Sequence, residues 1–302
     1  MSMHVQPNPL DQPLPGGQAG ATVTVEPMVT GELQMVPEAM ESSGGRVESL
    51  RIARGMLAGG APRVPVPCFL IRHPGAGAIL VDTGLHPSVT TDPRLNFGRI
   101  LARVLAPSLA AGEDVVSQVR RRGVDPEEIR TVILTHLHVE HASAISELPD
   151  ATFIVTLAEW EAATGARPTG QGYRHSQYDH AFDYRTVSYD GSQINSYAGF
   201  GRTFDLFGDS SVRLAYTPGH TAGHQSVICR LGERDFVIGG DVAYMERQIK
   251  EEGALLPASV ADEHNYRRSL REVRLFHDQY PDAVITPGHD PSFYARAEAK
   301  YS

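Results

Sequence analysis

Cysteine is scarce in this sequence, and so are several features that would place the chain in a familiar class. Only two of its 302 residues are cysteines, Cys68 and Cys229, which excludes a disulfide scaffold and a CxxC-type metal site. Both lie in apolar stretches, so we expect buried packing residues. No apolar run approaches the roughly 18 residues that span a bilayer, and no signal-peptide pattern opens the sequence. We therefore expect a cytoplasmic protein.

Basic residues are fewer than acidic residues in this sequence. Lysine and arginine together number 27 against 36 aspartates and glutamates, which gives a net charge of −9, and no block of basic residues is longer than three. We therefore expect neither nucleic acid nor an anionic membrane surface as a partner. The hydrophobic fraction of 41% can fill a sizeable core, which excludes global disorder. From the length of 302 residues we expect one large domain, or two fused halves.

Short strands alternate loosely with helical stretches along the chain, which predicts a mixed α/β fold with sheets inside helices. Residues 159–190 are polar and lack periodicity, so we predict a long loop or lid there. Residues 1–20 contain four prolines and are predicted to be a flexible tail, or an arm that clasps a second subunit in a homodimer. Strands are predicted at 21–25, 67–71, 78–81, 131–134, 151–157, 212–216, 226–229, 236–238 and 283–286, and helices within 87–123 and over 262–279.

Histidine, by contrast, is abundant, with thirteen residues. Four short motifs that each follow a predicted strand present metal-type side chains: THLHVEH (135–141), TPGHTAGH (217–224), GGD (239–241) and TPGH (286–289). Imidazoles and carboxylates need polar partners when buried, and nitrogen and oxygen donors at this density suit a divalent metal ion. One such motif alone is compatible with a solvated or capping loop, whereas four together indicate a metal site.

These motifs, in this order and preceded by Asp82-Thr83-Gly84, resemble the metallo-β-lactamase superfamily, whose signature is His-x-His-x-Asp-His. The resemblance covers roughly residue 67 to the C-terminus. It implies a four-layer αβ/βα sandwich with the metal site at one edge between the two sheets, forming a single domain over residues 21–302 with a helical insertion at about 87–123. The acyl-homoserine lactonase group is the most similar, because Tyr244 follows Asp241 by three residues there as well.

The resemblance also implies a ligand set for two divalent metal ions, most simply Zn²⁺. Asp241 would bridge both ions. Glu140 stands where the family has aspartate, and it would serve either as a ligand of the second ion or as the proton donor to the leaving alkoxide. The implied ligands are His136, His138 and His220 for one ion and Glu140, His141, Asp241 and His289 for the other.

Three further residues have implied roles around that centre. Asp82 resembles the acid that orients a ligand imidazole through its far nitrogen. His224 would either support a ligand or pack its loop. Tyr244 would either donate a hydrogen bond to a developing oxyanion or be a core tyrosine. Phe97, Ile100, Leu101 and Leu105 are expected to be divided between the core and an apolar wall for an acyl chain.

The implied activity is hydrolysis of a small lactone, an N-acyl-homoserine lactone or similar, by attack of a metal-bridging hydroxide. Alternatives within the superfamily are a thioesterase of the glyoxalase II kind or another ester hydrolase. Glyoxalase II carries an extra helical domain for which the thirteen residues after His289 leave no room. A β-lactamase of the best-known subclass would have cysteine in place of Asp241. A non-catalytic ligand-binding member is the alternative of a different class.

Overall fold

Short runs of aliphatic and β-branched residues form the strands of two β-sheets in the computed structural model, which describes residues 5–165 and 171–302. The larger sheet has the strand order β1-β7-β6-β5-β4-β3-β2, and the smaller one β13-β12-β11-β10-β9-β8. The strands are β1 (Asn8–Pro9), β2 (Thr24–Gln34), β3 (Arg63–His73), β4 (Gly77–Val81), β5 (Thr131–Ile133), β6 (Thr152–Thr156), β7 (Asp183–Val187), β8 (Ile194–Tyr197), β9 (Phe200–Asp205), β10 (Val212–Tyr216), β11 (Gln225–Arg230), β12 (Asp235–Ile238) and β13 (Val284–Thr286).

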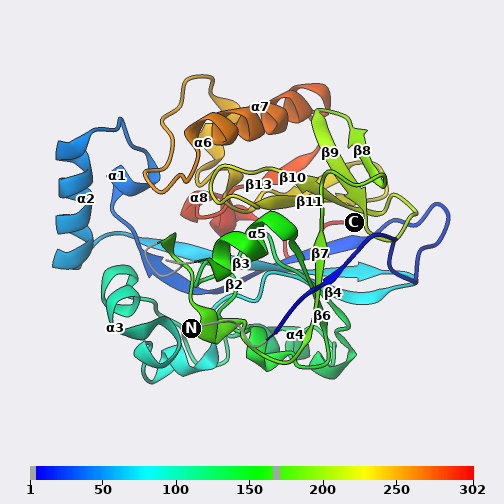
Figure 1. The fold of residues 1–302 in the computed structure, drawn as a ribbon, viewed down its shortest axis with the longest axis horizontal. Helices are drawn as coiled ribbons and strands as arrows, with labels where there is room; N and C mark the ends of the chain where they lie inside the picture. Colours follow the sequence, from blue (N-terminus) through cyan, green and yellow to red (C-terminus); the bar gives the residue numbers. More distant parts are fainter. Residues whose placement is uncertain (1–4, 166–170) are drawn as a thin grey trace.

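Helices cover the outer faces of the two sheets (Figure 1). The longest begins after Asp262, whose side chain accepts a hydrogen bond from the Asn265 backbone N–H at 3.0 Å, as an N-cap does. Within the described ranges, no helix is both long and apolar enough to span a membrane. The helices are α1 (Pro37–Met40), α2 (Arg46–Ala58), α3 (Arg94–Leu105), α4 (Val115–Arg121), α5 (Leu157–Thr164), α6 (Glu246–Lys250), α7 (Glu263–Gln279) and α8 (Pro291–Arg296).

Three apolar clusters define the layers. One joins the inner faces of the two sheets and includes Ile79, Ile133, Leu214 and Ile238. A second packs the outer face of the larger sheet against α4 and α5, and a third packs the smaller sheet against α7. The arrangement is therefore helix, sheet, sheet, helix, which confirms the predicted α/β sandwich.

Strand direction sets where the functional loops meet. In the larger sheet β4, β5, β6 and β7 are parallel, and in the smaller sheet β12 and β13 are parallel. The carboxyl ends of parallel strands meet at one edge of a sheet, where ligands bind in open α/β folds. The motifs after β5, β10, β12 and β13 therefore lie at one end of the sandwich.

The segment predicted as a loop or lid, 159–190, also contains regular structure, so that prediction is wrong for the residues of helix α5 and strand β7. Helix α5 covers its start, with Trp160 and Ala163 buried. Strand β7 then pairs in parallel with β6, and its side chains alternate so that Tyr184 is buried. Tertiary packing on the larger sheet accounts for both elements. Residues 166–170 of this segment lie outside the described residues.

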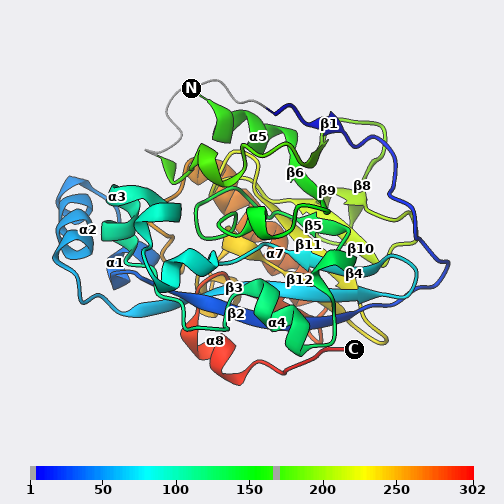
Figure 2. The ribbon, with the colours of Figure 1, turned by 90° about the horizontal axis from the view of Figure 1, so that it is seen from below.

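Part of the predicted N-terminal tail is packed on its own chain. Strand β1 pairs in parallel with β7 at the edge of the larger sheet, and Leu10 is buried in the inter-sheet cluster. This corrects the expectation of a flexible tail or arm for residues 8–10, because main-chain pairing and apolar burial both hold them. Residues 1–4 of that predicted tail lie outside the described residues. Figure 2 shows β1 at the margin of the sheet, away from α1, α2 and α3.

Several strand limits also differ from the predicted ones. The first long strand runs over Thr24–Gln34, well beyond the predicted 21–25, because it pairs with the full length of β3. Strands β8 and β9 were not predicted, and they form a hairpin at the edge of the smaller sheet. The β3–β4 hairpin and α7 confirm the predicted strands at 67–71 and 78–81 and the predicted helix.

Candidate metal centre

The seven side chains expected to be metal ligands come together at one end of the sandwich. They form two groups, and within each group one donor atom per residue lies within 4.8 Å of the others. The first group draws on the loops after β5 and β10, and the second on the loops after β5, β12 and β13. The groups are His136, His138 and His220, and Glu140, His141, Asp241 and His289.

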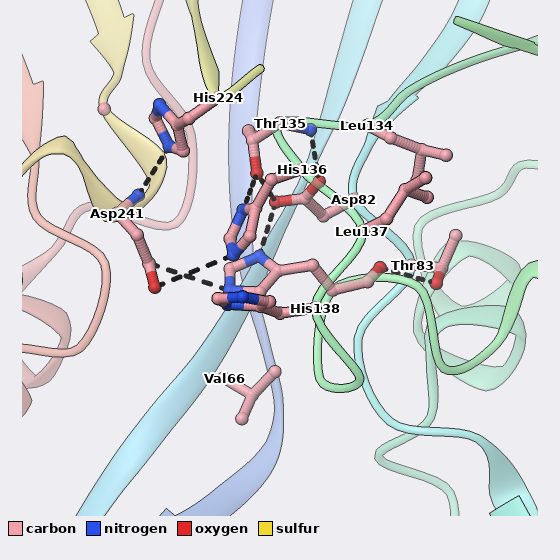
Figure 3. A network of polar contacts seen from close by, with 12 residues as sticks. Val66, Asp82, Thr83, Leu134, Thr135, His136, Leu137, His138, His224 and Asp241 are labelled. Carbon is pink, nitrogen blue, oxygen red and sulfur yellow. Dashed lines mark hydrogen bonds and ion pairs between the residues drawn. The ribbon is translucent and has the colours of Figure 1, made fainter. Parts of the chain in front are cut away.

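Asp241 lies between the two groups and is fully buried. Its Oδ2 atom is 3.2 Å from His220 Nε2 and 3.4 Å from His289 Nε2. The same oxygen is 3.8 Å from His136 Nε2, and Oδ1 is 3.6 Å from His141 Nε2. Figure 3 shows the Asp241 carboxylate and the His136 imidazole facing each other. One carboxylate is thus shared by histidines of both groups.

Buried donor atoms at this point lack hydrogen-bond partners. Within the described part of the chain, both Asp241 carboxylate oxygens and the Nε2 atoms of His136, His141 and His289 make no hydrogen bond. Leaving such atoms unsatisfied in a protein interior costs about 1–3 kcal/mol each. Nitrogen and oxygen donors converging on one point are the ligand set of Zn²⁺ and related cations, so the residues present fit a divalent metal ion.

The His138–His220 contact leads to the same conclusion. His138 Nδ1 lies 2.9 Å from His220 Nε2, so two neutral imidazoles would need one of these nitrogens to carry a proton. A cation held by the first group would instead accept a lone pair from each of these two nitrogens. Burial lowers the pKa of His220 well below its ordinary value, which favours the neutral imidazole that binds metal.

Asp82 orients one of these imidazoles from outside the cluster. Its carboxylate accepts hydrogen bonds from the Thr135 backbone N–H and hydroxyl, each at 2.8 Å. It also pairs with His141 Nδ1 at 2.8 Å. With its Nδ1 held by Asp82, His141 points its Nε2 towards Asp241. Although burial acts in the opposite direction, the Asp82 and Asp241 carboxylates raise the pKa of His141 to about 9.

His289 and His224 are fixed through their Nδ1 atoms in a similar way. His289 Nδ1 donates to the Pro65 carbonyl at 2.9 Å, which turns its Nε2 towards Asp241. His224 Nδ1 lies 3.0 Å from the Thr217 carbonyl oxygen, and its Nε2 accepts the Asp241 backbone N–H at 2.9 Å. Burial lowers the pKa of His224 to about 4, so this ring is neutral. His224 therefore holds the Asp241 backbone and does not face the cluster with a free nitrogen.

Tyr244 and Glu140 border a pocket of about 430 Å³ that opens beside the cluster. The Tyr244 ring lies across the His289 and His220 rings, with centroids 5.1 and 5.6 Å apart. Its hydroxyl is 2.8 Å from Ser259 Oγ. Burial, and after it the Asp241 carboxylate, raise the pKa of Tyr244 well above its ordinary value, so the hydroxyl keeps its proton and can donate it.

The rest of the pocket wall is mainly apolar. Leu101 and Leu105 of α3 line it together with Met35, Val139 and Val260. Of the other two α3 residues considered for a wall, Phe97 is buried in the core and Ile100 is 72% exposed. The prediction that these residues divide between core and pocket therefore holds for three of the four. A pocket with this lining suits an apolar chain ending near the cluster.

Two residues near the site were not predicted. Glu159 accepts hydrogen bonds from backbone groups in two of the histidine motifs, and Ser259 is paired with Tyr244. For Glu159 the sequence held a usable signal, since Thr156 and Glu159 have the spacing of a capping box that opens a helix. Ser259 lies in an irregular segment with no such pattern.

Comparison with known proteins agrees with this geometry. Residues 61–289 match the metallo-beta-lactamase superfamily, and the chain belongs to that superfamily. Among its relatives is the N-acyl homoserine lactonase AttM of Rhizobium radiobacter, which is 33% identical over 252 residues, or 83% of this chain and 90% of the relative. An N-acyl homoserine lactonase of Bacillus cereus is 26% identical over 194 residues, or 63% of this chain and 68% of the relative.

The fold is also shared with solved structures. One is an N-acyl homoserine lactone hydrolase with its product N-hexanoyl-L-homoserine bound at the catalytic metal center. It superposes with a TM-score of 0.71 at 19% sequence identity, covering 94% of this chain and 98% of the other. At this identity the likeness establishes a common fold.

Proposed function

We propose that this protein is a metal-dependent hydrolase that opens small lactones of the N-acyl-homoserine lactone type. The observation that carries the proposal is the group of unpaired, buried imidazole and carboxylate atoms around Asp241, beside a pocket with an apolar wall. Its relatives named N-acyl homoserine lactonase, which match most of the chain, support the substrate class.

We assign the ligands as two sets that share one carboxylate. His136, His138 and His220 would hold one ion, and Asp241 would contribute to both sites. The second set would be Glu140, His141, Asp241 and His289. The donors are nitrogen and oxygen without sulfur, and zinc is the ion that such sets most commonly hold. When bound, two such ions supply a water nucleophile at neutral pH and polarise the carbonyl under attack.

The chain's own residues position the substrate around that chemistry. Tyr244 presents a protonated hydroxyl at the pocket wall and would donate a hydrogen bond to the carbonyl oxygen as negative charge develops on it. Leu101 and Leu105 would contact an acyl chain extending away from the cluster. Glu140 is 7% exposed at the boundary between pocket and cluster, and we favour a ligand role for it, with proton donation to the leaving alkoxide as the alternative.

Metal removal with a substrate panel tests this proposal. The chelated, metal-free chain should lose hydrolysis of N-acyl-homoserine lactones, and zinc, cobalt or manganese should restore it. Parallel assays with thioesters, β-lactams and phosphodiesters show whether lactones are the preferred class. Activity that survives verified metal removal, or a clear preference for thioesters, would contradict the proposal in its metal or its substrate part respectively.

A further inference from the structure

A buried carboxylate outside the proposed ligand set connects two of the histidine motifs. Glu159 lies in the first turn of α5 and is completely buried. Its Oε1 atom accepts the Leu137 backbone N–H at 2.9 Å, and its Oε2 atom accepts the Gly223 backbone N–H at 3.1 Å. Leu137 lies between His136 and His138, and Gly223 lies between His220 and His224. One side chain therefore holds both loops.

Thr156, the residue that caps α5, completes this connection. Its hydroxyl accepts the Glu159 backbone N–H at 2.9 Å and donates to the Gly223 carbonyl at 2.7 Å. Both backbone groups of Gly223 are thus satisfied by α5 and its cap. A Cβ atom at residue 223 would lie 2.0 Å from the Glu159 backbone nitrogen, so only glycine permits this approach. The contact therefore depends on Thr156 and Glu159 in one segment and on glycine at position 223 in the other.

Burying a carboxylate is costly unless hydrogen bonds stabilise it. Two backbone N–H donors do so here, and bonds to an ionised acceptor are about twice as strong as neutral ones. Because the two donors belong to different loops, the side chain fixes the spacing between those loops. That spacing brings His138 Nδ1 and His220 Nε2 to 2.9 Å from each other. If Glu159 did not hold the two loops, these two nitrogens would move apart.

We propose that Glu159 is a positioning residue that sets the metal affinity of the His136, His138 and His220 site. It acts through the Leu137 and Gly223 backbones and is not itself a ligand, since it belongs to neither group of clustered donors. The second site depends less on it, because His289 comes from the loop after β13, with which Glu159 forms no hydrogen bond in the described part of the chain. This inference rests on the proposed metal centre.

The test is metal affinity of the Glu159→Gln variant, measured by competition with a chromophoric chelator. An amide of the same shape can accept only one of the two N–H groups and presents its own N–H to the other, which releases one loop. Residues that hold ligands in place typically contribute about 10–100-fold to metal affinity. We expect one of the two bound equivalents to weaken by that factor, with an altered visible spectrum of the cobalt-loaded protein.

Glu161→Gln is the matched control, because Glu161 is exposed on the same helix and should leave both affinities unchanged. Glu159→Asp keeps the charge but reaches only one loop, so its affinity should fall between wild type and Glu159→Gln. A lower melting temperature with unchanged affinities in both Glu159 variants would overturn the inference and leave the proposed function intact. Failure of both variants to fold at saturating zinc would also overturn it. Wild-type protein that binds no metal would overturn both proposals.

Discussion

The Tyr244 side chain combines a buried ring with a hydroxyl at the pocket wall. Replacing Tyr244 by Phe keeps the ring against His289 and His220 and removes only the hydroxyl and its contact with Ser259. Loss of one oxyanion donor lowers turnover on the order of 10²-fold, so we expect a fall in kcat of about that size with metal content unchanged. Steady-state kinetics and elemental analysis measure the two quantities. An unchanged kcat with a lower melting temperature would make Tyr244 a packing residue only.

Glu140 is the position at which this chain departs from the aspartate of its family signature. If it is a ligand, Glu140→Gln should weaken the second metal site, because a neutral amide is a poor ligand for a divalent cation. Glu140→Asp should be tolerated. If instead it protonates the leaving alkoxide, Glu140→Gln should keep both metals and slow poor leaving groups most. Metal stoichiometry and rates across a series of leaving groups separate the two roles, and no change in either quantity would contradict both.

At the scale of elements, the loop after β10 packs so closely against α5 that there is no space for a side chain at residue 223. We expect Gly223→Ala to lower the free energy of unfolding by about 3 kcal/mol, because its Cβ would contact the Glu159 backbone and overpacking costs about this much. Gly232→Ala is the control, since a Cβ there meets nothing within 4 Å. Chemical denaturation of both variants measures the difference, and equal stability would show that the loop can move away.

Elements whose signals are local could be predicted from the sequence. The β3–β4 hairpin follows from two apolar runs around a Gly/Pro turn, and α7 follows from its Asp262 cap and apolar stripe. Strand β7 lacks such a signal, because its segment is polar overall and is held by packing on the larger sheet. Helix α5 has only the Thr156–Glu159 spacing at its start as a local signal. Short elements of this kind depend on tertiary contacts more than on their own composition.

The residues of the candidate site likewise fall into those that have a local sequence signal and those that have none. Its clustered histidines and acids were predicted because each follows a strand within a dense motif, and the structure brings all seven together. Glu159 and Ser259 are distant in sequence from the residues they contact. Their partners are set by the docking of α5 and of the irregular segment before α7, which no local pattern specifies.

At the scale of the whole molecule, both cysteines lie inside the sandwich. Cys68 and Cys229 are completely buried, and burial raises the pKa of each thiol. Because the thiolate is the reactive form, a disulfide reagent should modify neither residue in the native protein and both after denaturation. Thiol titration with a chromogenic reagent checks this expectation. Rapid modification of the native chain would show that one of the two sites opens without global unfolding.

The pairing of β1 with β7 has a consequence for the order of events during synthesis. Residues 8 and 9 leave the ribosome long before residues 183–187, which are their only strand partner in the described structure. Until β7 has been made and has joined β6, β1 cannot pair, and until β1 arrives, the outer edge of β7 stays open. Non-local pairings of this kind form slowly, and unpaired edges are where nascent chains aggregate. We therefore expect β1 to pair with the edge of β7 late in folding. A chaperone would protect the chain most in the interval before this pairing.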